Sequence, residues 1–544
     1  MPAGPTTKSG QINTVTPRGG SSLSPFAHRV FAILWAATVV SNIGTWMQNA
    51  AAGWLMTGLN PDPLIVALVQ VATTLPMFLL GLPAGALADI LDRRRLLIAV
   101  QITLTPLTAG FGLIVDLNLV TPGLLLGFTF LFGAGAALIA PAWQAIVPQL
   151  VPREDLPNAV ALNSVGINIS RAIGPALAGI IIGLAGLAAP FWLNAVSNLG
   201  VIGALVWWKP PAAGKRLPAE HISSAIRTGL RHAANNLHLR ATLLRAAGFF
   251  ISASAYWALL PLVARAQVQG GPQLYGILLG AIGAGAVAGA FALPKLKKQL
   301  GADRLVAGGT LGTAIALVLF ALARDPTTAL IASVLAGLSW IAVLATLNVS
   351  AQVALPSWVR GRGLATFAIV LFGSMSAGSA LWGQVGTWFG LPVAHFIAAA
   401  ALLAALPLLW RWKLQTGAGV DMSPSLHWPA PVLSNDVPAD RGPVLVTVEY
   451  RVPAQNQRLF LDAMTELKRQ RRRDGAYQWG IYQDAAEPER FVETFHLTSW
   501  LEHLRQHERV TEADRRHQER IAALLVPGAT PAISHLIAPD DYGW

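Results

Sequence analysis

The stretch "GALADILDRRRLL", Gly85–Leu97, lies between two long apolar runs and contains three consecutive arginines. A similar stretch, "GAFALPKLKKQL", begins at Gly289 in the second half of the chain. A second matching pair, "QAIVPQLV" from Gln144 and "QVALPSWV" from Gln352, has nearly the same separation. Two matches at one spacing indicate a parallel internal repeat, an arrangement in which a substrate sits between the two halves near the bilayer midplane.

Composition places the protein in a membrane. Of 544 residues, 53% are hydrophobic and only 12% are charged, and the mean hydropathy is +0.51. Apolar runs of 18 or more residues are long enough to cross a bilayer as helices, and we predict an all-α membrane protein of two six-helix repeats. The twelve predicted spans begin at Phe31, Leu64, Leu96, Thr121, Asn158, Leu187, Thr242, Gln273, Leu305, Thr327, Arg362 and Pro392.

The cations favour one orientation. Lys and Arg cluster in alternate links, such as Arg93–Arg95 and the central link, and cytoplasmic loops carry this excess. We therefore expect a multi-pass protein of the bacterial plasma membrane with both termini cytoplasmic. Residues 1–413 hold 25 Lys and Arg against 9 Asp and Glu, whereas the rest holds 14 against 18. The net charge of +12 thus belongs to membrane loops, and we expect no nucleic-acid partner.

These patterns divide the chain into six predicted parts. They are a disordered cytoplasmic N-terminus (1–28), a first bundle (29–208), a cytoplasmic central loop (209–240), a second bundle (241–413), a linker (414–441) and a cytoplasmic C-terminal domain (442–539).

Two motifs carry a resemblance to a known family. The loop "GALADILDRR" is similar to the signature between spans two and three of major facilitator transporters, and departs from it at Ile90 and Asp92. In span five, "GPALAG" is similar to an exporter signature, with Ala178 in place of a glycine. The matching residues are Gly85, Asp89, Arg93 and Arg94 in the loop and Gly174, Pro175 and Gly179 in span five.

Residues 25–413 therefore resemble the branch of that superfamily that contains siderophore exporters and macrolide efflux proteins, the transmembrane secretion effectors. The resemblance implies proton-coupled secondary export of a siderophore-like compound or drug by alternating access. It also implies that the loop residues form a conformational latch, with Gly85 letting a neighbouring backbone approach closely, and that the span-five residues form a hinge. The alternative for the loop arginines is that they only orient the protein.

Arg171 is the unusual residue of span five. It lies about 20 Å along the helix at ~1.5 Å per residue, near mid-membrane. Inserting a central arginine costs ~3 kcal/mol, so it must face protein or water. Two interpretations stay open: Arg171 binds an anionic or catecholate-like substrate or exchanges partners as the halves move, or it is a permanently satisfied structural cation.

Amides and aromatic residues in spans one, four, seven and ten suit a bulky amphipathic small molecule. If the family arrangement holds, they line the cavity, although an aromatic residue taken singly serves more often in packing or interfacial anchoring than in ligand contact. With span five, the candidate substrate residues are Asn42, Trp46, Gln48, Gln144, Asn168, Arg171, Tyr256, Trp257, Trp340 and Asn348.

Missing features limit the chemistry. No span has a central Asp or Glu to carry a proton, and His395 in span twelve is the remaining candidate. The sequence contains no P-loop and no cysteine, so we expect no ATP site, disulfide or thiolate metal site. We predict no cofactor, no metal and no enzymatic activity.

The C-terminal region alternates strand and helix patterns in the order βαββαβ, a ferredoxin-like unit. It resembles dimeric α+β barrel domains that include antibiotic-biosynthesis monooxygenases, with Glu493, Trp500 and His507 at comparable places. The alternative function is therefore a membrane-tethered enzyme or sensor with a reactive pocket near His503 and His507. We favour solvated histidines on one long helix and a role in homodimerisation or regulation.

Overall fold

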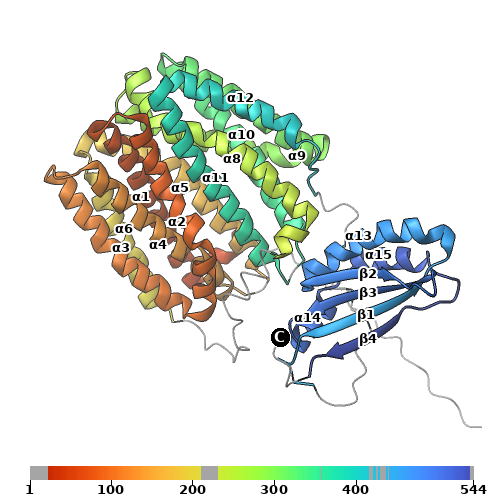
Figure 1. Ribbon diagram of the computed structural model, residues 1–544. Helices are drawn as coiled ribbons and strands as arrows, with labels where there is room; N and C mark the ends of the chain where they lie inside the picture. Colours follow the sequence, from red (N-terminus) through yellow and green to blue (C-terminus); the bar gives the residue numbers. More distant parts are fainter. Residues whose placement is uncertain are drawn as a thin grey trace, which may run out of the picture.

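The computed structural model describes residues 22–152, 154–209, 231–356, 358–415, 421–423, 425, 427–428, 437–438 and 440–539, apart from the side chain of Asp89. Most of the predicted 1–28 terminus, the 209–240 loop and the 414–441 linker lies outside these residues. Within them, eleven helices are long and apolar enough to cross a membrane. They are α1 (Arg29–Leu59), α2 (Pro63–Ile90), α3 (Arg93–Asp116), α4 (Pro122–Ile146), α5 (Leu156–Ala185), α6 (Ala189–Trp207), α8 (Leu237–Leu262), α9 (Pro272–Leu322), α10 (Pro326–Val353), α11 (Arg360–Phe389) and α12 (Leu391–Leu409) (Figure 1).

Several of these helices begin with a capping side chain followed by proline. Asp62 accepts hydrogen bonds from two backbone N–H groups in the first turn of α2, and Pro63 follows it. Asp325 and Pro326 do the same for α10. The side chain satisfies N–H groups that have no partner within the helix, and proline needs none there. The predicted starts of these two spans lie one residue inside the observed ones.

Helix α9 contains both the eighth and the ninth predicted spans. It is assigned as one helix of 51 residues, which at ~1.5 Å per residue is about 77 Å, more than twice the thickness of the hydrocarbon core. Gly301 interrupts it with a φ of 74°, a left-handed conformation that glycine tolerates. The described residues therefore contain eleven assigned membrane-length helices where we predicted twelve spans, and the difference lies at Gly301.

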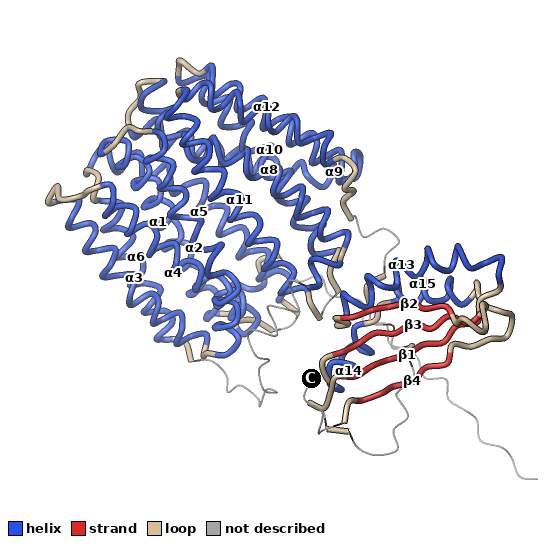
Figure 2. Tube along the Cα trace, in the orientation of Figure 1, coloured by secondary structure: helices blue, strands red, loops and turns tan. Residues whose placement is uncertain are grey.

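The helices form two groups, α1–α6 (the first group) and α8–α12 (the second group), which lie side by side in Figures 1 and 2. Two helix pairs join them: α2 packs on α11, and α5 packs on α9. Near the middle of the α2–α11 contact, the hydroxyl groups of Thr74 and Ser376 are 2.7 Å apart.

A small sheet lies near the C-terminus, and we refer to residues 440–539 as the tail. Its elements are β1 (Val444–Arg451), α13 (Gln457–Asp474), β2 (Gln478–Gln483), β3 (Arg490–Leu497), α14 (Trp500–Arg509), α15 (Glu512–Ala522) and β4 (Ala532–Ile537). The strands are antiparallel in the order β2-β3-β1-β4 (Figure 2). Our prediction of one long helix after β3 is wrong, because Thr511 and Asp514 form a capping box that starts α15 as a separate helix.

The tail contacts the second group at the end where α8 begins. Arg231, in the segment before α8, donates to Glu502 over 3.2 Å and to the carbonyl of Gly475. The guanidinium carbon of Arg509 lies 4.6 Å from the ring centre of Trp358, in the loop between α10 and α11. These contacts combine an ion pair with a cation–π interaction.

Candidate functional site

The main candidate site is a cavity inside the first group. It has about 1210 Å³ of empty space, including space open to solvent, and all six helices α1–α6 contribute to its lining. A pocket of this scale with a mainly apolar wall and a few polar groups is typical of small-molecule sites. Its polar lining residues are Thr38, Ser41, Asn42, Thr45, Gln101, Gln144, Asn163, Asn194 and Asn198.

Hydrogen bonds hold three of the six lining amides in place. Ser41 Oγ donates to Asn198 Oδ1 over 2.8 Å, Trp143 Nε1 donates to Asn163 Oδ1 over 2.9 Å, and Asn194 Nδ2 donates to Gln48 Oε1. Gln101 Oε1 and Thr38 Oγ1 differ, because both are buried without a hydrogen-bond partner. A buried polar group left unpaired costs free energy that a ligand can recover. The cavity therefore offers an unpaired amide oxygen and an unpaired hydroxyl group to a ligand.

Three of the predicted substrate residues, Asn42, Trp46 and Gln144, line this cavity. Gln48 is buried behind it, where its Oε1 accepts a 2.6 Å hydrogen bond from the lining residue Asn194. Asn168 faces away, exposed and bonded to the carbonyl of Ser164. We expected lining from spans one, four, seven and ten, but the second group contributes nothing to this cavity.

The predicted residues of the second group lie elsewhere. Tyr256, Trp257 and Trp340 form a ring cluster, with centroids 5.6 Å apart for Tyr256–Trp257 and for Trp257–Trp340. Trp340 Nε1 is buried without a hydrogen-bond partner. Asn348 is separate and exposed, and accepts a 2.5 Å hydrogen bond from Gln352 Nε2.

Arg171 connects the two regions. Its guanidinium carbon lies 5.3 Å from the ring centre of Trp46, which lines the cavity. Tyr256 of the second group lies within electrostatic range of the same cation. Arg171 Nε is buried without a hydrogen-bond partner, and no described residue forms an ion pair with it.

Contact between α5 and α9 forms what we call the seam, which runs from Gly179 and Gly276 to Ala172 and Gly283. A Cβ added to Gly276 would lie 2.6 Å from the carbonyl oxygen of Pro175, and one added to Gly283 would lie 2.6 Å from Cα of Ala172. The two backbones are therefore as close as small residues permit. The glycines of α9 therefore act in helix packing.

Beyond Ala172 the two helices separate. Val165, seven residues earlier on the same face of α5, is 48% exposed. On α9, the face that carries Gly283 continues through Val287 to Phe291, and the Phe291 side chain is 83% exposed. The seam is thus closed toward Gly179 and open toward the end that carries the tail, and Arg171 is adjacent to the last contact.

Polar contacts close the same end that the seam closes. Arg265 Nη1 donates to Thr57 Oγ1 over 3.1 Å, and Thr387 Oγ1 donates to Asp62 Oδ1 over 3.0 Å. Each contact joins a residue of the first group or its α1–α2 loop to the second group or the segment that follows α8. The two groups therefore meet at one end and part at the other.

The predicted hinge residues also pack closely. A Cβ on Gly174 would lie 2.6 Å from Trp46 Cβ, so α5 lies against α1 at this level. Pro175 and Gly179 face α9, as the contacts of Gly276 demonstrate. The hinge sequence is therefore wedged between two helices.

The predicted latch residues act within the first group. Arg93 Nε donates to the carbonyl of Ala88, and Arg94 Nε donates to the carbonyl of Leu205 over 2.7 Å, at the C-terminal end of α6. Cations suit such helix ends. Gly85 does not serve the close helix approach that we predicted, because a Cβ added there would meet nothing within 4 Å. The side chain of Asp89 lies outside the described residues.

The tail encloses a buried polar cluster. Glu493 accepts hydrogen bonds from Arg471, Trp479 and Tyr450 at 2.8–3.3 Å. The His503 ring is 2% exposed, not solvated as we predicted, and burial lowers the pKa of this imidazole to about 3. Within the described residues, no group of three His, Asp or Glu side chains is arranged to hold a metal.

Residues 20–541 match the family described as transmembrane secretion effector. The chain belongs to this family. Transmembrane secretion effectors are part of the major facilitator superfamily, and the apolar helices make this member a multi-pass membrane protein.

Curated relatives of this secretion effector match over part of their length. The Staphyloferrin A transporter of Staphylococcus aureus is 26% identical over 266 residues, 48% of this chain and 65% of that protein. Macrolide efflux protein A of Streptococcus pyogenes is 23% identical over 176 residues, 32% of this chain and 42% of that protein. The matched stretches span less than two thirds of each relative.

Solved structures share the fold. A bacterial homologue of the human lysosomal transporter Spinster, in an inward-facing and occupied conformation, has a TM-score of 0.58 at 15% identity. The alignment covers 72% of this chain and 97% of that chain. At this identity the likeness shows that the two chains share a fold.

Proposed function

We propose that this protein is a secondary active transporter that exports a small amphipathic molecule, a siderophore-like compound or a macrolide-type drug, across the bacterial plasma membrane. The observation that carries the proposal is the seam, closed at one end and open at the other with Arg171 at the boundary. A bundle with this asymmetry is one of the two states that alternating access requires. Relatives named for staphyloferrin A and macrolides support the substrate classes.

The proposed topology has twelve crossings. The break at Gly301 divides α9 into two membrane spans, which gives six in each group. Both termini are then cytoplasmic, because the basic links lie at the end of the bundle that carries the tail. The open end of the seam faces the cytoplasm, so a molecule made inside the cell can enter.

We propose that Arg171 recognises substrate. Its unpaired Nε and the neighbouring Trp46 ring suit an anionic group attached to an aromatic or apolar body. The cavity in the first group would hold the bulk of the molecule, and the Tyr256–Trp257–Trp340 cluster would close over it as the seam shifts. Arg93 and Arg94 would keep the first group rigid during this motion.

Proton coupling remains a prediction from the family. His395 is fully buried, with Nδ1 bonded to the carbonyl of Leu391 and Nε2 without a partner. We propose it as the group to test, because no membrane span contains a central carboxylate.

The tail is proposed as a ferredoxin-like regulatory appendage rather than an enzyme. Its strand order supports this fold. The sheet face that lacks helices carries Tyr482 and Leu536, both more than half exposed, and we retain homodimerisation through this face as a prediction. The molar mass of the purified protein, measured by light scattering at several concentrations, tests homodimerisation.

The test of the proposed function is substrate retention in intact cells. Cells that express the wild type should accumulate less enterobactin, staphyloferrin A or erythromycin than cells without it, and a proton uncoupler should abolish the difference. Truncation after Lys413 separates transport from any tail activity. If none of the three compounds is depleted relative to empty cells, the proposed substrate classes are wrong.

A further inference from the structure

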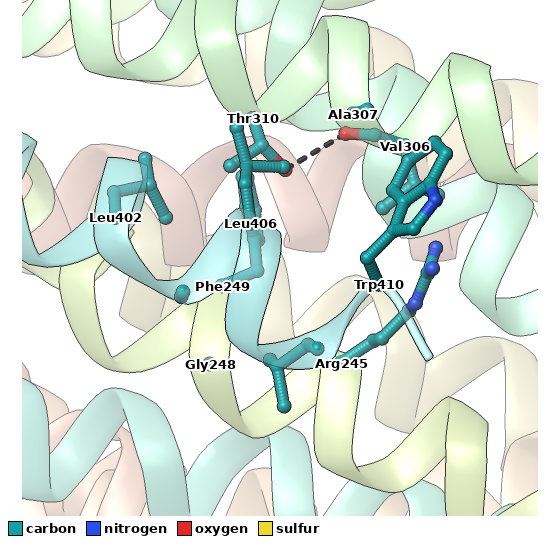
Figure 3. A pocket seen from close by; sticks show the side chains of 11 residues that line it. Arg245, Gly248, Phe249, Val306, Ala307, Thr310, Leu402, Leu406 and Trp410 are labelled. Carbon is teal, nitrogen blue, oxygen red and sulfur yellow. Dashed lines mark hydrogen bonds between the residues drawn. The ribbon is translucent and has the colours of Figure 1, made fainter. Parts of the chain in front are cut away.

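We propose that the cleft between α8, the part of α9 after Gly301 and α12 binds an anionic glycerophospholipid, with its phosphate on Arg245 and an acyl chain along α12. This site lies outside the candidate substrate cavity and does not depend on which molecule is exported. Figure 3 shows the cleft, with Arg245 extending toward the Trp410 indole.

The cleft is apolar except at one end. It has about 340 Å³ of empty space, including space open to solvent, and Phe249, Val306, Leu402 and Leu406 form much of its wall. The Thr310 hydroxyl donates to the carbonyl of Val306 over 2.7 Å, so it is already paired (Figure 3). The guanidinium of Arg245 is therefore the polar group left to receive a ligand.

Arg245 is 6% exposed and only partly satisfied. One terminal nitrogen, Nη1, pairs with Asp303 Oδ1 at 2.9 Å. Nε and Nη2 are buried and have no hydrogen-bond partner. These two nitrogens form one edge of the planar guanidinium, the edge that binds a phosphate through two parallel N–H groups. A buried cation with an unused edge costs free energy unless a ligand occupies it.

The depth of Arg245 fits a lipid phosphate. The 19 residues of α12 extend about 28 Å, close to the ~30 Å of the hydrocarbon core, so Leu409 marks its boundary. Trp410 follows at the interface, where tryptophan is enriched, and the Arg245 guanidinium lies 5.7 Å from its ring centre. Leu402 lies about 10 Å deeper at ~1.5 Å per residue, along the direction of an acyl chain. Leu408, on the same helix, is 70% exposed and faces the surroundings of the bundle.

The rim of the cleft is strongly basic, which favours an anionic headgroup. Lys413 Nζ lies 4.1 Å from the Trp410 ring centre, and both Arg240 and Arg411 lie within 6 Å of the Trp412 ring centre. Asp303 is the acid paired with Arg245, and it also accepts from the backbone N–H of Leu414. Cations thus outnumber the acid, and basic pockets of this kind on the cytoplasmic side select lipids such as phosphatidylglycerol or cardiolipin.

Native mass spectrometry of the full-length protein tests the proposal. The probes are dioleoyl phosphatidylglycerol and dioleoyl phosphatidylcholine at equal concentration, and we expect the wild type to retain one phosphatidylglycerol preferentially. Arg245→Gln should weaken that binding about tenfold, the effect of losing charge-assisted hydrogen bonds. The matched control is Arg29→Gln, since Arg29 also lies near a tryptophan, with its guanidinium carbon 6.0 Å from the Trp207 ring centre, and is exposed. It should bind phosphatidylglycerol like the wild type.

A second variant keeps the proposal testable if Arg245→Gln fails to fold. Ala405→Phe fills the apolar part of the cleft and leaves the Arg245–Asp303 pair intact, and it should also lose the lipid. Excess glycerol 3-phosphate, a headgroup without acyl chains, should fail to displace phosphatidylglycerol from the wild type. Equal retention of both lipids by the wild type, unchanged binding in Ala405→Phe, or full displacement by glycerol 3-phosphate would each overturn the proposal.

Discussion

The guanidinium of Arg171 stacks over Trp46 at 5.3 Å, one residue from the point where α5 and α9 cease to touch. A cation at such a boundary changes its surroundings whenever the seam opens or closes. We predict that Arg171→Ala lowers export of enterobactin, staphyloferrin A or erythromycin at least about tenfold, since a desolvated cation–π contact and one charged hydrogen bond together contribute ~2–4 kcal/mol. Cellular accumulation of each compound measures it.

Arg171→Lys is the control for charge alone. It keeps the cation but loses the planar stack on Trp46, so intermediate export is expected. Membrane abundance of each variant should equal that of the wild type. Full export by Arg171→Ala at equal abundance would contradict a role in transport and favour the structural cation.

The two ends of the helical bundle should respond in opposite directions. Because the chain contains no cysteine, pairs of introduced cysteines can be cross-linked without interference from native cysteines. Val165→Cys with Phe291→Cys samples the open end, and Leu64→Cys with Thr387→Cys samples the closed end, where the Leu64 N–H donates to Thr387 Oγ1 over 3.1 Å. Conditions that increase cross-linking of one pair by a short thiol reagent should decrease that of the other. Simultaneous high yield at both ends would rule out alternating access.

Glycine substitutions provide a matched stability test of the seam. Gly276→Ala places a methyl group 2.6 Å from the carbonyl of Pro175 and should destabilise the protein by ~1–3 kcal/mol. Gly127→Ala, on a face of α4 with no atom within 4 Å, should be neutral or stabilise by up to ~1 kcal/mol. Thermal unfolding in detergent compares the two. Equal melting temperatures would mean that the backbones at Gly276 are not in close contact.

The tail should lose stability in mild acid. Burial, with nearby His535 and His507, lowers the pKa of His503 to about 3, whereas an unfolded histidine titrates near ~6.5. Between these values only the unfolded state takes up the proton, so the free energy of unfolding falls as the pH drops below about 6.5, by up to ~1.4 kcal/mol per unit. Hydrogen exchange of α14 measures it. His503→Leu should flatten the pH dependence, and His496→Leu, on the opposite sheet face, should not.

The contact between tail and bundle can be tested by charge exchange. Arg231→Glu places a carboxylate beside Glu502 and leaves the Arg509–Glu502 pair within the tail intact, so the tail should release and α14 should become more sensitive to protease. Arg231→Lys keeps the cation and should retain protection. A surface exchange of Glu466 and Arg469, an exposed pair within α13, serves as the control.

The positions of the membrane helices could be predicted because length and hydropathy decide whether a helix crosses a bilayer, but the predicted number of twelve differs from the eleven membrane-length helices assigned among the described residues. The starts of α2 and α10 were predictable to one residue since Asp62 and Asp325 cap them. The C-terminal strands were likewise visible from alternation, but the division between α14 and α15 was missed although "TEAD" at Thr511 is a readable capping box.

The site was less predictable, because it depends on how each helix is rotated. Asn194 and Asn198 line the cavity and were overlooked, although two amides four residues apart in an apolar span mark one polar face. At Gly85 the sequence predicted too much. The family motif predicted a close approach of a neighbouring helix, but a Cβ added to Gly85 would meet no atom within 4 Å. Contacts between distant helices, such as Arg171 with Trp46, leave no spacing pattern in the sequence.

The attachment of the tail through Arg231 and Trp358 has a mechanical consequence. Both anchoring points belong to the second group and the segment that leads into it, so the tail is fixed to one of the two groups that the proposed transport cycle would move. A small rotation of the second group would therefore displace the tail strands farthest from these contacts by a larger distance. A fluorophore attached at the exposed position Tyr482 should therefore report the motion of the second group in the proposed transport cycle. Its signal can be measured without labelling the membrane-embedded helices.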